Sequence, residues 1–176
     1  IYGKSGGTAS VFDFDNPSCP LGLNTWPGEP AYYLASLNNE LYLGTSNYIY
    51  SKSAGALNAT SLGGFAKSYA IVDSGIFVGT MNGATMQIKM LGSTDFTVKQ
   101  TMSSSAGLII LKAYTGNIIA VGINSATPAV NNGLYLYYPE FNLLLKISSR
   151  PVYAIAIKWS SIIILFLPRI RKHPYF

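Results

Sequence analysis

The sequence predicts an all-β fold made of about four stacked antiparallel sheets, each formed by a repeat of roughly 40 residues. Three observations support this prediction. Apolar runs that favour β-structure recur along the chain and end on Gly44, Gly79 and Gly122. A turn-forming cluster precedes each run, and another apolar run precedes each cluster. The glycines are spaced by roughly 40 residues, the interval expected for one small sheet per repeat.

The composition fits a single all-β domain, residues 1–176, with enough apolar residues for a substantial core. Hydrophobic residues make up 49% of the chain, which argues against intrinsic disorder. Charged residues make up only 11%, and Ser, Thr, Asn, Gly and 13 tyrosines take their place. This balance favours β-structure with hydroxyl-rich and amide-rich loops, and it suits a surface outside the cell.

Residues 1–30 contain one predicted strand, Ala9–Asp15. The glycines before it, Gly3, Gly6 and Gly7, indicate a loop. Several prolines follow it, and because proline removes a backbone donor we expect a long irregular connection there.

Three complete repeats follow, at residues 31–66, 67–107 and 108–150. Each is predicted to hold four strands. Asparagine and glycine tolerate the left-handed backbone of tight hairpins, so Asn38-Asn39 and Asn82-Gly83 are the clearest turn signals. The predicted strands are Tyr32–Leu37, Glu40–Gly44, Tyr48–Tyr50 and Ala59–Leu62, then Tyr69–Val72, Ile76–Gly79, Thr85–Met90 and Phe96–Thr101, then Leu108–Ala113, Ile118–Ile123, Gly133–Tyr138 and Asn142–Ile147.

Residues 151–176 begin a fourth repeat and hold only half of one. Val152–Lys158 alternates between two faces, and Ile162–Leu167 is a continuous apolar run, as expected for a strand covered on both sides. A stack of sheets must protect its edges. We therefore expect residues 9–15 to complete the sheet begun by residues 152–167, which would close a ring of about four sheets.

The chain resembles the β-propeller repeat proteins through Leu41-Tyr42-Leu43-Gly44-Thr45, Phe77-Val78-Gly79-Thr80 and Ala120-Val121-Gly122, over roughly residues 31–167. The resemblance implies a small β-propeller or a blade-like stack of antiparallel sheets, and it carries over no functional residue. The repeated glycine has two interpretations. It marks either a close approach of a neighbouring sheet or a simple strand end or bulge.

Few residues suit catalysis. His173 is the single histidine and lies in the terminal tail, where a general base is poorly held. Cys19 is the single cysteine, so the chain has too few ligands for a zinc site. We therefore expect a protein that is not an enzyme and requires no cofactor.

One cluster of oxygen ligands is a candidate metal site. Asp13 and Asp15 fall on the same face of a strand, with Asn16 at its end. Carboxylate and amide oxygens placed in this way suit a hard cation such as Ca²⁺. The alternative is a strand that ends in an Asx-type turn.

Tyrosine is overrepresented in the composition, with 13 residues. Tyr48, Tyr50, Tyr137 and Tyr138 are the candidate ligand-binding residues, because hydroxyl-tipped rings suit protein interfaces and can stack on sugars. The alternative is packing within the sheets, where tyrosine is favoured in any case.

The surface predicts protein partners. The net charge of +5 is spread thinly, whereas nucleic-acid binders concentrate it, so we expect no nucleic-acid partner. Asn58 begins an N-glycosylation sequon, which would be used in a secreted protein. The apolar residues 152–167 have a basic flank, as in a membrane anchor. They are too short for the hydrocarbon core and include Lys158, so we expect a strand and keep anchoring as the alternative.

The function we expect is that of a non-enzymatic structural or binding module in an extracellular, cell-surface or virion assembly. It would act through contacts with other protein chains, either copies of itself or members of a larger assembly, and the apolar terminal strand could pair with another chain. The alternative is a carbohydrate-binding or carbohydrate-hydrolysing propeller that uses acidic residues and tyrosines in a cleft.

Overall fold

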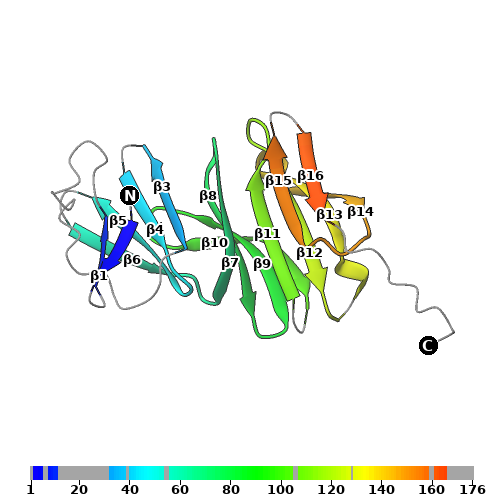
Figure 1. Ribbon diagram of the computed structural model, residues 1–176, viewed down its shortest axis with the longest axis horizontal. Coiled ribbons are helices and arrows are strands. Elements are labelled where there is room, and N and C mark those ends of the chain that lie inside the picture. The colour runs from blue at the N-terminus through cyan, green and yellow to red at the C-terminus, as the bar shows by residue number, and fades with distance from the viewer. Residues whose placement is uncertain are drawn as a thin grey trace, which may run out of the picture.

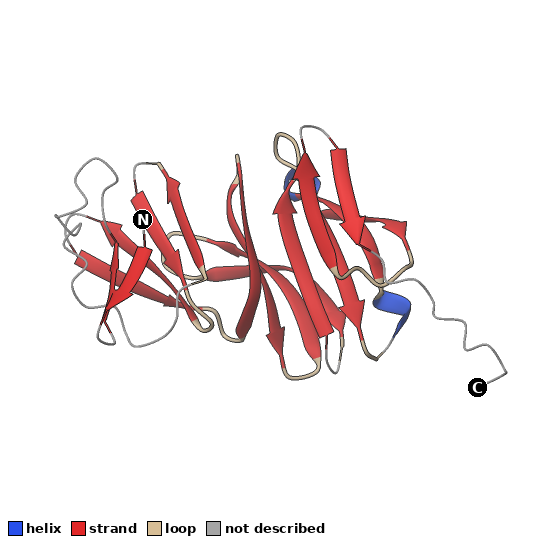
Figure 2. Ribbon diagram, in the orientation of Figure 1, coloured by secondary structure: helices blue, strands red, loops and turns tan. Residues whose placement is uncertain are grey.

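The chain is all-β in a computed structural model that describes residues 2–5, 8–11, 32–38, 40–53, 56–104, 107–127, 129–158 and 161–165 (Figures 1 and 2). These residues form three four-stranded antiparallel sheets and two hairpins. The three sheets correspond to the three predicted repeats of roughly 40 residues. The prediction of repeated antiparallel sheets is therefore confirmed.

The strands of each sheet follow one another in chain order. Sheet 1 contains β3 (Tyr33–Leu37), β4 (Glu40–Gly44), β5 (Tyr48–Ser53) and β6 (Ala56–Ser61). Sheet 2 contains β7 (Phe65–Val72), β8 (Gly75–Asn82), β9 (Thr85–Leu91) and β10 (Phe96–Ser103). Sheet 3 contains β11 (Gly107–Ala113), β12 (Ile119–Ser125), β13 (Gly133–Tyr138) and β14 (Leu143–Ser148). Two short 3-10 helices, η1 (Ala129–Asn131) and η2 (Pro139–Phe141), connect strands of sheet 3.

Two hairpins complete the described part. The N-terminal ribbon pairs β1 (Tyr2–Ser5) with β2 (Thr8–Val11), and sheet 4 pairs β15 (Ala154–Lys158) with β16 (Ser161–Leu165). Gly3 lies within β1, so the prediction of a loop at that residue is wrong. Its backbone pairs with that of Ser10. The completion of sheet 4 by residues 9–15 stays a prediction, because β2 pairs with β1 and residues 12–15 lie outside the described part.

The turns follow from residues that tolerate a left-handed backbone. Asn38 has a φ of 52° between β3 and β4, and Gly83 has a φ of 56° between β8 and β9. Both conformations suit the right-handed twist of the strands that the turns connect. The two clearest turn signals of the sequence are therefore confirmed.

Sheets 1, 2 and 3 lie in a row that starts beside the N-terminal ribbon, and sheet 4 overlaps sheet 3 in the view of Figure 1. The first strands of sheets 2, 3 and 4 approach one another, since β7 contacts β11 and β11 contacts β15. A buried apolar layer separates each pair of neighbouring sheets. The layer between sheets 2 and 3 includes Phe77, Ile109 and Tyr137, all without solvent exposure.

The repeated glycines lie where a side chain of the next sheet packs closely against the backbone. A Cβ added to Gly44 would lie 2.6 Å from the Tyr69 ring of sheet 2. At Gly122 it would lie 2.6 Å from Val152, just before β15. At Gly79 it would lie 3.1 Å from Ile109 of sheet 3. Of the two interpretations of these glycines, the close approach of a neighbouring sheet holds.

Residues 152–167 contain strands over the part that the structure describes. β15 and β16 account for residues 154–158 and 161–165. Among the described residues, no helix has both the length and the apolar character needed to cross a bilayer.

Candidate binding surfaces

The four candidate tyrosines lie on different sheets and do not form one site. Tyr48 and Tyr50 lie on β5, with ring centroids 5.9 Å apart. Tyr48 is 36% exposed, whereas Tyr50 is buried. Tyr50 therefore serves the packing of sheet 1, and Tyr48 is the accessible member of the pair.

Tyr137 and Tyr138 are neighbours on β13 with opposite environments. Tyr137 is fully buried, meets the ring of Phe77 edge-on, and donates a hydrogen bond to Asn142 Oδ1 at 2.9 Å. Burial raises the pKa of its hydroxyl. Tyr138 is half-buried beside a cavity of about 380 Å³ that Glu140 and Phe141 also line. A ligand-binding role for the four tyrosines stays a prediction.

The structure describes the sequon residue Asn58 but not the residues of the candidate metal site. Asp13, Asp15 and Asn16 lie outside the described residues, so the Ca²⁺ hypothesis stays a prediction. Within the described ranges, no group of three or more His, Cys, Asp or Glu side chains could hold a metal ion. Asn58 lies exposed on β6, the outer strand of sheet 1, so its amide is accessible to a glycosyltransferase.

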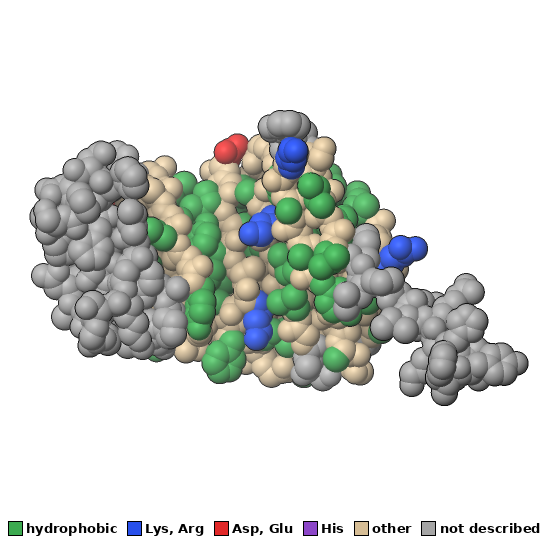
Figure 3. Space-filling view, in the orientation of Figure 1, with side chains coloured by type: hydrophobic (Ala, Val, Ile, Leu, Met, Phe, Trp, Pro, Cys, Tyr) green, Lys and Arg blue, Asp and Glu red, His purple; other side chains and the backbone are tan. Residues whose placement is uncertain are grey.

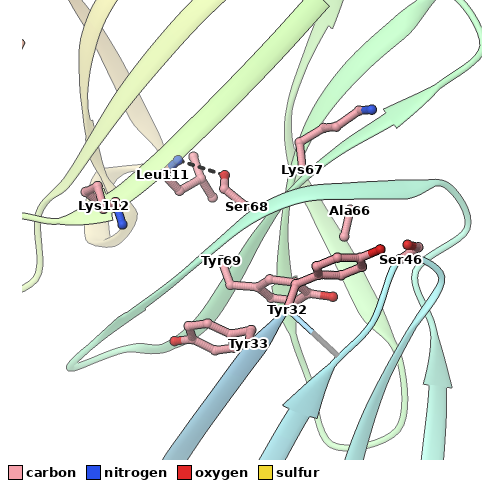
Figure 4. Close-up of a pocket in the computed structure, with 9 residues that line it drawn as sticks. All are labelled: Tyr32, Tyr33, Ser46, Ala66, Lys67, Ser68, Tyr69, Leu111 and Lys112. Carbon is pink, nitrogen blue, oxygen red and sulfur yellow. Dashed lines mark hydrogen bonds between the residues drawn. The ribbon is translucent and has the colours of Figure 1, made fainter. Parts of the chain in front are cut away.

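A cavity opens where sheets 1 and 2 meet. It encloses about 480 Å³, and the rings of Tyr32, Tyr33 and Tyr69 gather on one side of it (Figure 4). Tyr33 stacks on Tyr69 with centroids 4.8 Å apart, and the Tyr69 hydroxyl donates to the carbonyl of Thr45 at 2.7 Å. Tyr32 is 66% exposed, so its ring is free to contact a ligand.

A second cavity continues this one across sheet 2 towards sheet 4. It encloses about 590 Å³ and shares Tyr33, Tyr69 and Lys112 with the first. We call the two together the tyrosine groove. Lys67 and Lys112 are exposed beside it, and none of the acidic residues that the structure describes lines it.

Ser68 fixes the floor of the tyrosine groove. Its hydroxyl donates to the carbonyl of Ile109 at 3.0 Å and accepts a hydrogen bond from the backbone amide of Leu111 at 2.8 Å (Figure 4). These two bonds join the edges of β7 and β11 through one side chain. The groove is therefore lined by strands that cannot separate without leaving backbone groups unpaired.

The largest cluster of exposed aliphatic side chains on one strand lies on β14, within the described part. Leu143, Leu145 and Ile147 are 49%, 47% and 52% exposed. Leu143 and Leu145 pair with Tyr138 and Leu136 and lie on one face of sheet 3, and Ile147 follows at a register shift between β13 and β14. We call the surface formed by these three side chains the open face. Leu145 pairs with Leu136, which packs in the layer beneath sheet 4, so the open face is the continuation of that layer.

The open face is exposed because sheet 4 has two strands among the described residues, whereas sheet 3 has four. Ile162 and Ile164 of β16 pack in the layer that contains Leu134 and Leu136 of β13. Within the described residues no strand lies beyond β16 to cover β14. Apolar side chains are visible at the surface around sheet 4 (Figure 3).

β10, the fourth strand of sheet 2, is covered on the face that points towards sheet 3. Met102 of β10 packs against the layer shared with sheet 3, and the Gln100 amide donates to the carbonyl of Asn142 at 2.9 Å. Sheet 3 therefore reaches across all four strands of sheet 2. Sequence reasoning predicted the strand at 142–147 but missed its open face. The missed signal was the run of leucines at 143–145, which makes both faces of β14 apolar.

Comparison with known proteins gives no further guidance. No model of a known protein family matches the chain. No similar sequence is found among curated proteins. The two surfaces are therefore interpreted from their own chemistry.

Proposed function

We propose that this chain is a non-enzymatic, propeller-type binding module that acts through protein–protein contacts at its open face. The observation that carries the proposal is the half-exposure of Leu143, Leu145 and Ile147 on one strand. Isolated exposed apolar residues are ordinary, but a contiguous row continuing a buried layer is typical of an interface. Removing the rest of these three side chains from water would contribute roughly 2–4 kcal/mol.

An extracellular, cell-surface or virion setting is part of the proposal. It is supported by the low content of charged residues and by the accessible Asn58 on an outer strand. The row of sheets with adjoining first strands supports the propeller interpretation. Closure of that row into a ring remains part of the proposal.

Native mass spectrometry of the protein from its natural source tests this function. We expect a particle heavier than the same material after denaturation into single chains. The substitution Leu145→Lys should release the free chain, because a lysine ammonium at the interface would be desolvated without a partner. The matched control is Val98→Lys, which also changes a residue that is 47% exposed on the fourth strand of a sheet. Native material that consists of free chains only would contradict the proposal.

A second candidate function is carbohydrate binding in the tyrosine groove. It is favoured by the exposed ring of Tyr32 above a stacked tyrosine pair, an arrangement on which a sugar ring can stack. Saturation-transfer NMR with neutral oligosaccharides should give signals that Tyr32→Ala removes and Tyr153→Ala leaves unchanged. Equal signals in both variants would rule out this role for the groove.

A further inference from the structure

Within the described part, sheet 4 corresponds to half of a repeat unit. Sheets 1, 2 and 3 each have four strands, whereas sheet 4 has two among the described residues. The described residues hold no counterpart in sheet 4 of the third and fourth strands of the other sheets. In sheet 3 these are β13 and β14, and they lie over the outer strands of sheet 2.

A partner that supplies these two strands would have a defined place. It would pair with the edge of β16 that faces away from β15, an edge without a strand partner in the described part. From there it would extend over Leu143, Leu145 and Ile147. A strand that adds to this edge therefore satisfies backbone groups and covers the open face at the same time.

The outer face of sheet 4 is the other place where a partner could pack. Leu165 occupies the register position that Gly44 and Gly79 hold in sheets 1 and 2, counted from the hairpin turn. Those glycines accept a side chain from the next sheet, and Leu165 is instead 54% exposed. Because sheet 4 has no glycine at this position, a fifth sheet could not pack on it in the same way. Ile163 and Leu165 of this outer face are both 54% exposed, so the place beside β16 is preferred because its backbone edge has no strand partner in the described part.

The described part contains, besides sheet 4, a second two-stranded element that belongs to no larger sheet. The N-terminal ribbon pairs Tyr2–Ser5 with Thr8–Val11 and is hydrogen-bonded to no strand of sheets 1–3. It lies at the opposite end of the row from sheets 3 and 4 (Figure 1). Sheets 1 and 2 separate the ribbon from the open face of its own chain, whereas the open face of a neighbouring copy can approach it directly.

We propose that copies of this chain associate head to tail, with the N-terminal ribbon of one copy pairing with β16 of the next copy and covering its open face. This inference rests on the proposed function and names the partner at the same surface. The contact joins two different surfaces, so repetition produces a ring if the rotation between copies closes and a filament if it does not.

A complementation experiment tests the inference on purified protein. The donor is the full chain with Leu145→Lys, which keeps the ribbon and loses the open face. The acceptor lacks residues 1–11, so it keeps the open face and loses the ribbon. Each variant alone should stay at the mass of one chain in sedimentation equilibrium, and an equimolar mixture should give a one-to-one dimer. Wild-type protein should form larger species as its concentration rises.

Matched controls and opposing outcomes make the result decisive. Val98→Lys should associate like wild type, whereas Leu145→Lys should weaken association by roughly 30-fold or more, as expected for a central interface residue. Circular dichroism should show the same β-structure in all variants.

A mixture that stays monomeric would overturn the inference. So would a monomeric wild type that loses thermal stability without residues 1–11, because the ribbon would then serve its own chain. A heavier native particle made with other proteins would retain the proposed function and overturn only the head-to-tail contact.

Discussion

Thr45 and Thr80 follow Gly44 and Gly79, yet their hydroxyl groups have different surroundings. Thr45 Oγ1 donates to the carbonyl of Tyr48 at 3.2 Å and accepts its backbone amide at 3.1 Å. Thr80 Oγ1 is buried with no hydrogen-bond partner among the residues that the structure describes. A buried polar atom without a partner costs free energy that a methyl group in its place would not.

The substitution Thr80→Val should therefore stabilise the protein by about 1 kcal/mol. The matched change Thr45→Val should destabilise it by about 1 kcal/mol, because it removes these two hydrogen bonds and a third, longer one from the Asn47 amide. Urea unfolding followed by circular dichroism measures both free energies. A loss of stability in Thr80→Val equal to that in Thr45→Val would show that the Thr80 hydroxyl does have a partner.

Tyr33 connects the tyrosine groove to the pH dependence of stability. Burial raises the pKa of its hydroxyl from 10.0 to about 12. The unfolded chain thus loses this proton at lower pH than the folded chain does. The contribution of Tyr33 is fully present below pH 10 and is lost as the pH rises towards 12. Lys89 has the opposite effect. Because burial lowers the pKa of its ammonium group, its contribution to the free energy of unfolding increases as the pH rises towards 10.5.

Comparison of wild type with Tyr33→Phe isolates the contribution of this one hydroxyl. Between pH 9 and pH 11 the free energy of unfolding should fall less steeply in the variant, because phenylalanine has no proton to lose. Urea titrations at a series of pH values provide the slopes. Parallel curves for the two proteins would contradict a raised pKa at Tyr33.

At the scale of elements, stacking depends on contacts between a glycine of one sheet and a side chain at the start of the next. Gly122 contacts Val152 and Ile155, and the Val152 amide donates to the carbonyl of Ile123 at 3.2 Å. This contact positions sheet 4 over sheet 3. It therefore also determines where sheet 4 ends and where the open face begins.

The substitution Gly122→Ala should destabilise the protein by about 1–3 kcal/mol, because its Cβ would lie 2.6 Å from Val152. In Gly122→Ala/Val152→Ala the loss should be smaller than the sum of the two single losses, since the second change makes room for the first. Chemical denaturation of the four proteins measures this coupling. Additive losses would indicate that the two residues do not meet.

The sequence predicted these elements well where turn and strand signals agree. β4 and β13 have the predicted bounds, and Asn38 has the left-handed conformation expected of its turn. The predicted start of β7 was late, because Ala66, Lys67 and Ser68 carry little strand preference and are held by neighbouring strands. The long-range partners decided the bounds of β7.

The candidate site was harder to predict than the strands. Tyr137 and Tyr138 are adjacent in sequence, and only the position of sheet 2 shows that the first is buried beneath Phe77. Tyr32, Tyr33 and Tyr69 meet because two sheets approach each other. The open face depends on how far sheet 4 extends across sheet 3, which residue pattern alone does not encode.

For the molecule as a whole, the two ends of the row are different surfaces. One end has the N-terminal ribbon, and the other has a strand edge that pairs with no further strand among the described residues, beside three half-exposed aliphatic side chains. Edges of this kind are normally paired, covered or charged, because an open edge is a template for another strand. The account therefore requires a partner strand at β16 in the assembled protein.

Hydrogen–deuterium exchange at low and high protein concentration tests this requirement most directly. The account predicts that backbone amides of residues 143–148 and 161–165 exchange more slowly as concentration rises, because assembly pairs β16 and covers β14. The amides of β8 and β12, inside sheets 2 and 3, should exchange at the same rate throughout. Exchange at residues 143–148 and 161–165 that is equally fast at both concentrations would contradict the account.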